Sequence, residues 1–191
     1  MGKPKRIAKG FSDKRPSGPE QPITETVPDQ VALEHKASDL IDAGKLDDAA
    51  SIYRQLISSG CENPEIFTNL AAIYGVQKQF DDVIALLKTA VNVNPNDSNA
   101  YYSLGNALQE QGDTKSAILA YKTVLKLTPN DPDTYYLLGT AFQKQGSTKD
   151  AINAYKQALK LKPNDTDAHN SLGICLMREG NIVDLSPLLL F

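Results

Sequence analysis

The segment "AYKTVLKLTPND" (residues 120–131) recurs 34 residues later as "AYKQALKLKPND" (residues 154–165), and nine of the twelve positions are identical. Self-similarity at such a period is the sequence signature of a repeat architecture. Extending the same register along the chain gives four complete units and one incomplete unit. Their bounds are 30–63, 64–97, 98–131, 132–165 and 166–180.

The units keep the same chemical character at equivalent positions. Position 7 is leucine in four units, position 8 is small, and position 20 is alanine or valine. Proline occupies position 32 in three units. The residues at position 24 are Tyr53, Leu87, Tyr121 and Tyr155. The glycines at position 15 are Gly44, Gly112, Gly146 and Gly180.

A pair of helices in each unit explains these positions. Small residues at positions 8 and 20 let the two helices approach closely, and the aromatic residue at position 24 fills the space between neighbouring units. A left-handed glycine at position 15 can end the first helix, and the proline at position 32 stops the second. Asp97, Asp131 and Asp165 follow two residues after the prolines, where an aspartate can cap the next helix.

The whole pattern resembles the tetratricopeptide repeat, a helix–turn–helix unit, over residues 30 to about 180. The resemblance implies an all-α fold: a right-handed α-solenoid in which the first helix of each repeat, helix A, lines a concave face. One helix pair leaves an apolar face open, so the array is stable only as a stack. We expect a disordered, basic and proline-rich tail at residues 1–29 and an irregular apolar tail at residues 181–191.

The last segment, "NIVDLSPLLLF" (residues 181–191), departs from the repeat. Gly180 is expected to end helix A of the fifth unit, and Pro187 would break a second helix that begins near Val183. The apolar residues from Leu185 to Phe191 either fold back over the open end as a cap or mark the point where the array stops. The open end would allow end-to-end association of a chain that is otherwise expected to be monomeric.

Composition limits the classes of function. The net charge of -3 argues against a specific nucleic-acid partner, although residues 1–29 alone carry +2. No apolar run approaches the roughly 20 residues that a membrane-spanning helix needs. Two distant cysteines give no reason to invoke an oxidising compartment, so we expect a cytoplasmic protein. The sequence has no phosphate-binding glycine loop and no cluster of metal ligands, and His169 occupies a packing position, so we expect no cofactor, no metal and no catalysis.

Helix A positions 2, 5, 6, 9, 12 and 13 are expected to face the groove of the solenoid. Their side chains are rich in amides, which can both donate to and accept from the backbone of an extended peptide. Tyr102 and Tyr136 would anchor such a peptide, since aromatic residues are common interface hot spots. Alternatively, the tyrosines pack between helices and the amides are solvated. The candidate binding residues are Glu65, Asn69, Asn99, Tyr102, Asn106, Gln109, Asp133, Tyr136, Thr140, Gln143 and Asn170.

The leading hypothesis is a non-enzymatic scaffold that binds a protein partner, through a peptide or a helix, in this groove. The carboxylate clamp of some chaperone-binding members is not matched, because Tyr102, Asp167 and Ser171 stand where its basic residues belong. "LGNALQEQG" (residues 104–112) and "AINAYKQALKLKP" (residues 151–163) resemble the superhelical arm of O-linked N-acetylglucosamine transferases, although only Asn69 matches the asparagine ladder of that arm. The alternative hypothesis is an N-terminal targeting arm of a longer glycosyl- or sulfotransferase whose catalytic domain is absent from this chain.

Overall fold

The computed structural model describes the backbone of residues 28–185 and the side chains of residues 29–180. This part of the chain forms nine helices and no strand. The predictions of disorder before residue 28, and of a cap or an array end after residue 185, fall on residues outside the described range. The helices are α1 (Pro28–Asp42), α2 (Leu46–Ser58), α3 (Pro64–Val76), α4 (Phe80–Val93), α5 (Ser98–Gln111), α6 (Thr114–Leu127), α7 (Pro132–Gln145), α8 (Thr148–Leu161) and α9 (Thr166–Leu185).

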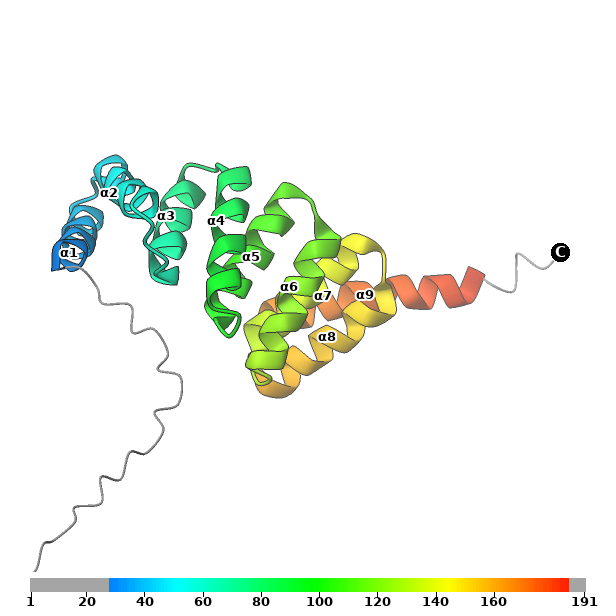
Figure 1. The fold of residues 1–191 in the computed structure, drawn as a ribbon. Coiled ribbons are helices and arrows are strands. Elements are labelled where there is room, and N and C mark those ends of the chain that lie inside the picture. The colour runs from blue at the N-terminus through cyan, green and yellow to red at the C-terminus, as the bar shows by residue number, and fades with distance from the viewer. Residues whose placement is uncertain (1–27, 186–191) are drawn as a thin grey trace, which may run out of the picture.

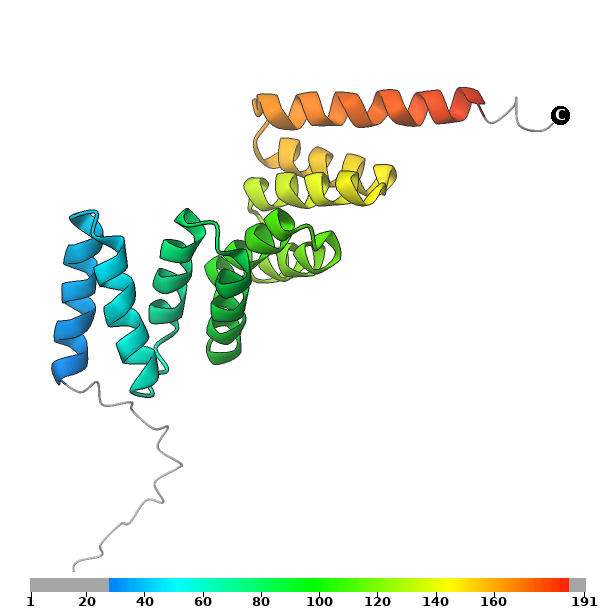
Figure 2. The same ribbon diagram turned by 90° about the horizontal axis from the view of Figure 1, so that it is seen from above.

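Successive helices stack into a solenoid with α1 at one end and α9 at the other (Figure 1). Each helix packs against its neighbours in sequence. The pairs α1/α2, α3/α4, α5/α6 and α7/α8 correspond to the four complete 34-residue units. Viewed from above, α1 and α9 run in very different directions, because the helix axes rotate along the stack (Figure 2). The all-α, right-handed solenoid that the sequence predicts is confirmed. None of the described helices is long and apolar enough to cross a lipid bilayer.

The residue at position 15 ends helix A in a left-handed conformation in four units. The backbone φ angles are +72°, +92° and +86° at Gly44, Gly112 and Gly146. In the third unit the N–H of Asp113, one residue further on, donates to the carbonyl of Leu108 at 2.9 Å. Such a bond satisfies a carbonyl that the helix end leaves without a partner. The second unit makes the same turn with Lys78, whose φ angle is +58°.

Replacing Lys78 with glycine is expected to raise the free energy of unfolding by about 0.5–1 kcal/mol. A non-glycine residue pays a steric cost in the left-handed region that exceeds the extra unfolded-state entropy of glycine. Urea denaturation of the wild-type chain and the variant measures the difference. Lys156→Gly, in the middle of α8, is the matched control and should lower stability by about 1 kcal/mol. A loss of stability in both variants would contradict a strained turn at Lys78.

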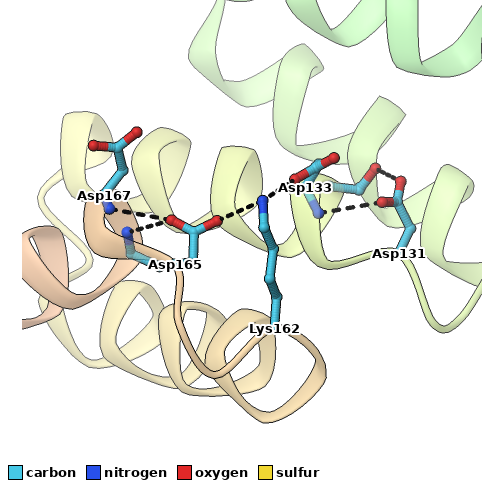
Figure 3. Close-up of polar contacts among 7 residues, drawn as sticks. Asp131, Asp133, Lys162, Asp165 and Asp167 are labelled. Carbon is cyan, nitrogen blue, oxygen red and sulfur yellow. Dashed lines mark hydrogen bonds and ion pairs between the residues drawn. The ribbon is translucent and has the colours of Figure 1, made fainter.

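Aspartates cap helix A of the third, fourth and fifth units, as predicted. Asp97 and Asp131 each accept a bond from a backbone N–H in the first turn, at 3.0 and 3.2 Å. Asp165 accepts two such bonds at 3.1 Å, and its carboxylate lies 3.0 Å from Lys162 (Figure 3). The backbone bond from Ala168, followed by the contact with Lys162, holds the pKa of Asp165 below its usual value. Lys162 also lies 3.7 Å from Asp133, so one lysine connects the starts of α7 and α9.

The tyrosine at position 24 lies against the glycine at position 8 of its own unit. A Cβ atom added to Gly105 would lie 2.5 Å from Cε1 of Tyr121, and one added to Gly139 would lie 2.6 Å from Cε1 of Tyr155. Both rings are fully buried. The missing side chain therefore makes room for the ring and lets the two helices approach closely. Tyr155 also packs in one cluster with Cys175 of the next unit, so the ring fills the space between units as expected.

The helix bounds differ from the prediction at both ends of the array. α1 begins at Pro28, so residues 28 and 29 belong to a helix rather than to the tail. Proline suits a first turn because the missing N–H would have no helical partner there. α9 continues through Gly180 to Leu185, so the predicted helix end at Gly180 and the irregular segment 181–185 are wrong. Within the described residues no helix follows α9 in the chain. Continuing α9 past Gly180 adds one backbone hydrogen bond per residue.

Candidate functional site

The candidate residues lie on α3, α5, α7 and α9, the first helices of four units. We call the surface formed by positions 2, 5, 6, 9, 12 and 13 of α1, α3, α5, α7 and α9 the helix-A face. Every candidate residue is exposed or half-buried, so each one reaches this surface. The candidates are Glu65 and Asn69 on α3, Asn99, Tyr102, Asn106 and Gln109 on α5, Asp133, Tyr136, Thr140 and Gln143 on α7, and Asn170 on α9.

Buried tyrosine hydroxyls meet the amides of the helix-A face in three places. The hydroxyl of Tyr121 donates to Oδ1 of Asn106 at 2.8 Å. That of Tyr155 lies 2.9 Å from Oε1 of Gln143 and 3.3 Å from the hydroxyl oxygen of Thr140. Burial raises the pKa values of both tyrosines, so both phenols are neutral hydrogen-bond donors at neutral pH.

The third contact joins two units. Nδ2 of Asn69 on α3 donates to the hydroxyl of Tyr53 on α2, at 3.3 Å. Each of these bonds fixes one end of an amide and leaves the other end for an additional partner. For Asn106 and Gln143 the tyrosine takes the amide oxygen, so the amide N–H groups remain available. The amides are therefore partly structural and partly free, whereas the sequence predicted amides that either bind a peptide or are solvated.

Tyr102 and Tyr136, the predicted anchors, are half-buried at equivalent positions of α5 and α7. The ring of Tyr136 packs on buried Tyr155, with centroids 5.7 Å apart and planes tilted by 47°. The phenol of Tyr102 lies near the amide of Asn106, and burial raises its pKa. Both rings are half-buried, so each keeps an exposed part, as an aromatic contact residue requires.

The remaining candidates have different surroundings. Glu65, Asn99 and Asn170 are exposed, and Asn170 lies on α9, away from the other two. Asp133 is exposed and pairs with Lys162 at 3.7 Å. Oε1 of Gln109 is buried and has no hydrogen-bond donor among the described residues. The candidates with buried hydrogen-bond partners are thus Asn69 on α3, Asn106 on α5, and Thr140 and Gln143 on α7.

A pocket of about 230 Å³ opens on the helix-A face between α3, α4 and α5. Apart from Asn106, its lining residues are not among the predicted site residues. The signal in the sequence was Leu87, which replaces the tyrosine found at position 24 of the other complete units. The lining residues are Thr68, Ala71, Ala72, Gly75, Phe80, Val83, Leu87, Ser103, Asn106, Ala107 and Glu110.

A second, more apolar hollow lies on the opposite side, between α2 and α4. It has a volume of about 470 Å³, and its lining includes Ile57, Cys61 and Leu86. The thiol of Cys61 accepts a bond from Nε2 of Gln30 at 2.8 Å. None of the candidate residues lines this hollow, which is therefore an alternative binding surface to the helix-A face.

The residues that carry catalysis most often in proteins have ordinary structural surroundings here. His169 is exposed, and its Nε2 lies 2.8 Å from the carbonyl oxygen of Pro163, so the predicted packing role is wrong. Cys175 is buried, as its register position predicts, and burial raises its pKa. Among the described residues, no group of three or more His, Cys, Asp or Glu side chains is placed to hold a metal ion.

Solved structures with the same architecture include two peptide-binding proteins. The crystal structure of MamA is 27% identical over 75% of this chain and 84% of its own, with a TM-score of 0.73. YrrB, described as a TPR protein with an unusual peptide-binding site, is 16% identical over 79% of this chain and 78% of its own, with a TM-score of 0.73. The first TPR of Spaghetti (RPAP3), bound to the HSP90 peptide SRMEEVD, is 17% identical over 61% of this chain and 93% of its own, with a TM-score of 0.59.

Two family models match the array. A model described as TPR repeat matches residues 106–146 and 144–180, and a model described as Tetratricopeptide repeat matches residues 40–108. Comparison with curated protein sequences finds no match. Together the two models span residues 40–180, which is most of the solenoid. The chain belongs to the tetratricopeptide-repeat family.

Proposed function

We propose that this chain is a non-catalytic scaffold that binds a partner peptide along the helix-A face. The observation that carries the proposal is that buried tyrosines hydrogen-bond one amide on each of α3, α5 and α7, namely Asn69, Asn106 and Gln143. Amides whose orientation is already fixed lose little freedom when they bind a ligand, which favours affinity. Their free donors and acceptors match those of a peptide backbone, the one feature common to all peptides.

The two position-5 tyrosines supply the apolar part of the proposed contact. Tyr102 and Tyr136 each combine a half-buried ring with a polar hydroxyl group. Such residues contribute strongly to interfaces because they lose little side-chain freedom on binding. YrrB and the Spaghetti domain, which share the fold, are described with a peptide-binding site and a bound peptide. None of the three structures named above is a transferase arm, so that alternative stays a prediction from the sequence. A monomeric state and a cytoplasmic location also stay predictions.

The proposal predicts that Tyr102→Ala weakens peptide binding about tenfold, a loss of about 1.4 kcal/mol, which is typical of an aromatic hot spot. A random dodecapeptide display library selected on the full 191-residue chain would supply the ligands. Titration calorimetry would give their dissociation constants for the wild-type chain and the variant. Circular dichroism would verify that the variant keeps its helical content.

Leu119→Ala is the matched control. Leu119 is 66% exposed on α6, outside the helix-A face, and its truncation should leave binding unchanged. If the selected peptides bind Tyr102→Ala as tightly as the wild-type chain, the helix-A face is not where they bind. Equal losses in both variants would point to a non-specific apolar interaction.

A further inference from the structure

We infer that the pocket beside Leu87 receives a bulky apolar side chain of a partner peptide whose neighbouring residues are Lys or Arg. The inference rests on the proposed function, because it names the chemistry of the peptide that the helix-A face would take. Two independent observations carry it: the shape and lining of the pocket, and the sign of the charges around it.

The pocket exists because three side chains in the second unit are small or short. Leu87 stands where other complete units have a tyrosine that reaches the helix-A face. Ala72 and Gly75 stand where α5 carries Asn106 and Gln109. A Cβ atom added to Gly75 would meet no heavy atom within 4 Å, so the space above this glycine is open. The cavity therefore follows from the residues that this unit has at positions 9, 12 and 24.

The size and the lining of the pocket favour one apolar side chain. Its volume of about 230 Å³ lies below the range of about 300–1,000 Å³ that is usual for small-molecule sites. Phe80, Val83 and Leu87 are among its apolar lining residues. Removing an apolar group from water against such a surface is worth about 25 cal/mol per Å². Asn106 at the same pocket could bond the backbone next to that side chain, since its amide nitrogen keeps its donors.

The ionised side chains of the helix-A face on the pocket's side of the array are acidic. On the helix-A face of α1, α3 and α5 the ionised side chains are Glu34, Asp42, Glu65 and Glu110, and these described positions include no Lys or Arg. Glu110 lines the pocket itself, and its side chain is exposed. A surface with one sign of charge attracts a ligand of the opposite sign and rejects one of the same sign. This half of the face therefore selects cationic peptides.

The other half of the face does not share this preference. On α7 and α9 the helix-A face carries Asp133 and Asp167 together with Lys144 and Arg178, so acids and bases balance. The selection for Lys and Arg is thus confined to the part of the face that contains the pocket. A partner peptide should place its basic residues close to its apolar anchor rather than along its whole length.

The experiment uses the dodecapeptide selection on the full chain and compares two filling variants. Ala72→Leu adds a branched side chain at an exposed position of the pocket wall. Ala85→Leu adds the same group at an exposed position of α4 that lies outside this pocket and lines the hollow between α2 and α4, so a loss of affinity there would place the peptides in that hollow. We expect the selected peptides to combine one Leu, Ile, Met or Phe with Lys or Arg beside it. Their affinity should fall about tenfold or more in Ala72→Leu and stay unchanged in Ala85→Leu.

A second pair of variants tests the charge. Glu110→Gln should weaken the same peptides several-fold, and Asp150→Asn, at an exposed position of α8 outside the helix-A face, should leave their affinity unchanged. Raising the salt concentration from about 0.05 M to about 0.5 M should reduce the difference between Glu110→Gln and the wild-type chain. Selected peptides that are acidic or uncharged, or that bind Glu110→Gln with unchanged affinity, would overturn the charge preference.

The outcomes separate this inference from the proposed function. Peptides that lose affinity in Tyr102→Ala but not in Ala72→Leu would overturn the pocket and leave the proposed function standing. A selection that yields no peptide sensitive to Tyr102→Ala would overturn both. A synthetic peptide of residues 1–15, which contains six Lys or Arg together with Ile7 and Phe11, is measured in parallel. If that peptide binds as tightly as the best selected one, the chain's own N-terminal segment is the occupant. That result would overturn the inference of a separate partner.

Discussion

Replacing Gly139 with alanine is expected to lower the free energy of unfolding by about 2 kcal/mol, since overpacking a filled core costs about 1–3 kcal/mol. The new methyl group would lie 2.6 Å from Cε1 and 2.7 Å from Cδ1 of Tyr155, closer than real contacts allow. The ring is fully buried and cannot move aside without shifting its neighbours. Urea denaturation monitored by circular dichroism measures the loss.

Gly173→Ala is the matched control for this prediction. Gly173 holds the same position 8 in α9, but an added Cβ atom there would meet nothing within 4 Å. The variant should therefore gain the helix propensity of alanine, about 0.5–1 kcal/mol, instead of losing stability. Opposite signs at the two glycines would support the glycine–tyrosine contact as the reason for glycine at position 8. Equal effects would refute it.

Truncating Tyr121 to alanine is expected to cost about 3–5 kcal/mol, the range for removing a buried aromatic ring. The ring belongs to the central core cluster, and its hydroxyl is the donor to Asn106. Because each unit of a solenoid is stabilised mainly by its neighbours, this loss falls on the middle of the array. Thermal and urea denaturation of the full chain measure it.

Tyr121→Phe separates the ring from its hydroxyl. This variant keeps the packing and removes one hydrogen bond, so it should lose only about 1 kcal/mol. It should also weaken peptide binding, because the amide of Asn106 is then no longer held in one orientation. If Tyr121→Ala were no less stable than Tyr121→Phe, the position-24 ring would not be the packing element described above.

The fold could be predicted from the sequence because the units repeat similar turn and capping residues. Glycine at position 15 and aspartate before helix A act through backbone geometry that neighbouring residues fix, so both could be predicted from the sequence. Lys78 shows that the turn does not depend on glycine, since the tertiary fold places a lysine in the left-handed region at a cost. Gly180 shows the reverse, because in the described part of the chain this position-15 glycine lies inside α9 and does not end it.

The candidate site could be predicted only in part. The register placed Asn106, Thr140 and Gln143 on the helix-A face, but it could not show that tyrosine hydroxyls 12 to 15 residues further along the chain bond to them. The pocket beside Leu87 was missed for a related reason. A pocket is formed by what neighbouring side chains leave empty, and single residues such as Ala72 and Gly75 carry no positive signal for it.

Hydrogen–deuterium exchange of the full chain, with and without a saturating selected peptide, tests the central claim most directly. Backbone amides at exposed helix ends exchange through local opening, which a bound ligand suppresses. The account predicts slower exchange in α3, α5 and α7, with α2, α6 and α8 unchanged. Protection confined to α2 and α4, around the hollow lined by Ile57, Cys61 and Leu86, would contradict it and place the binding surface on the opposite side of the solenoid.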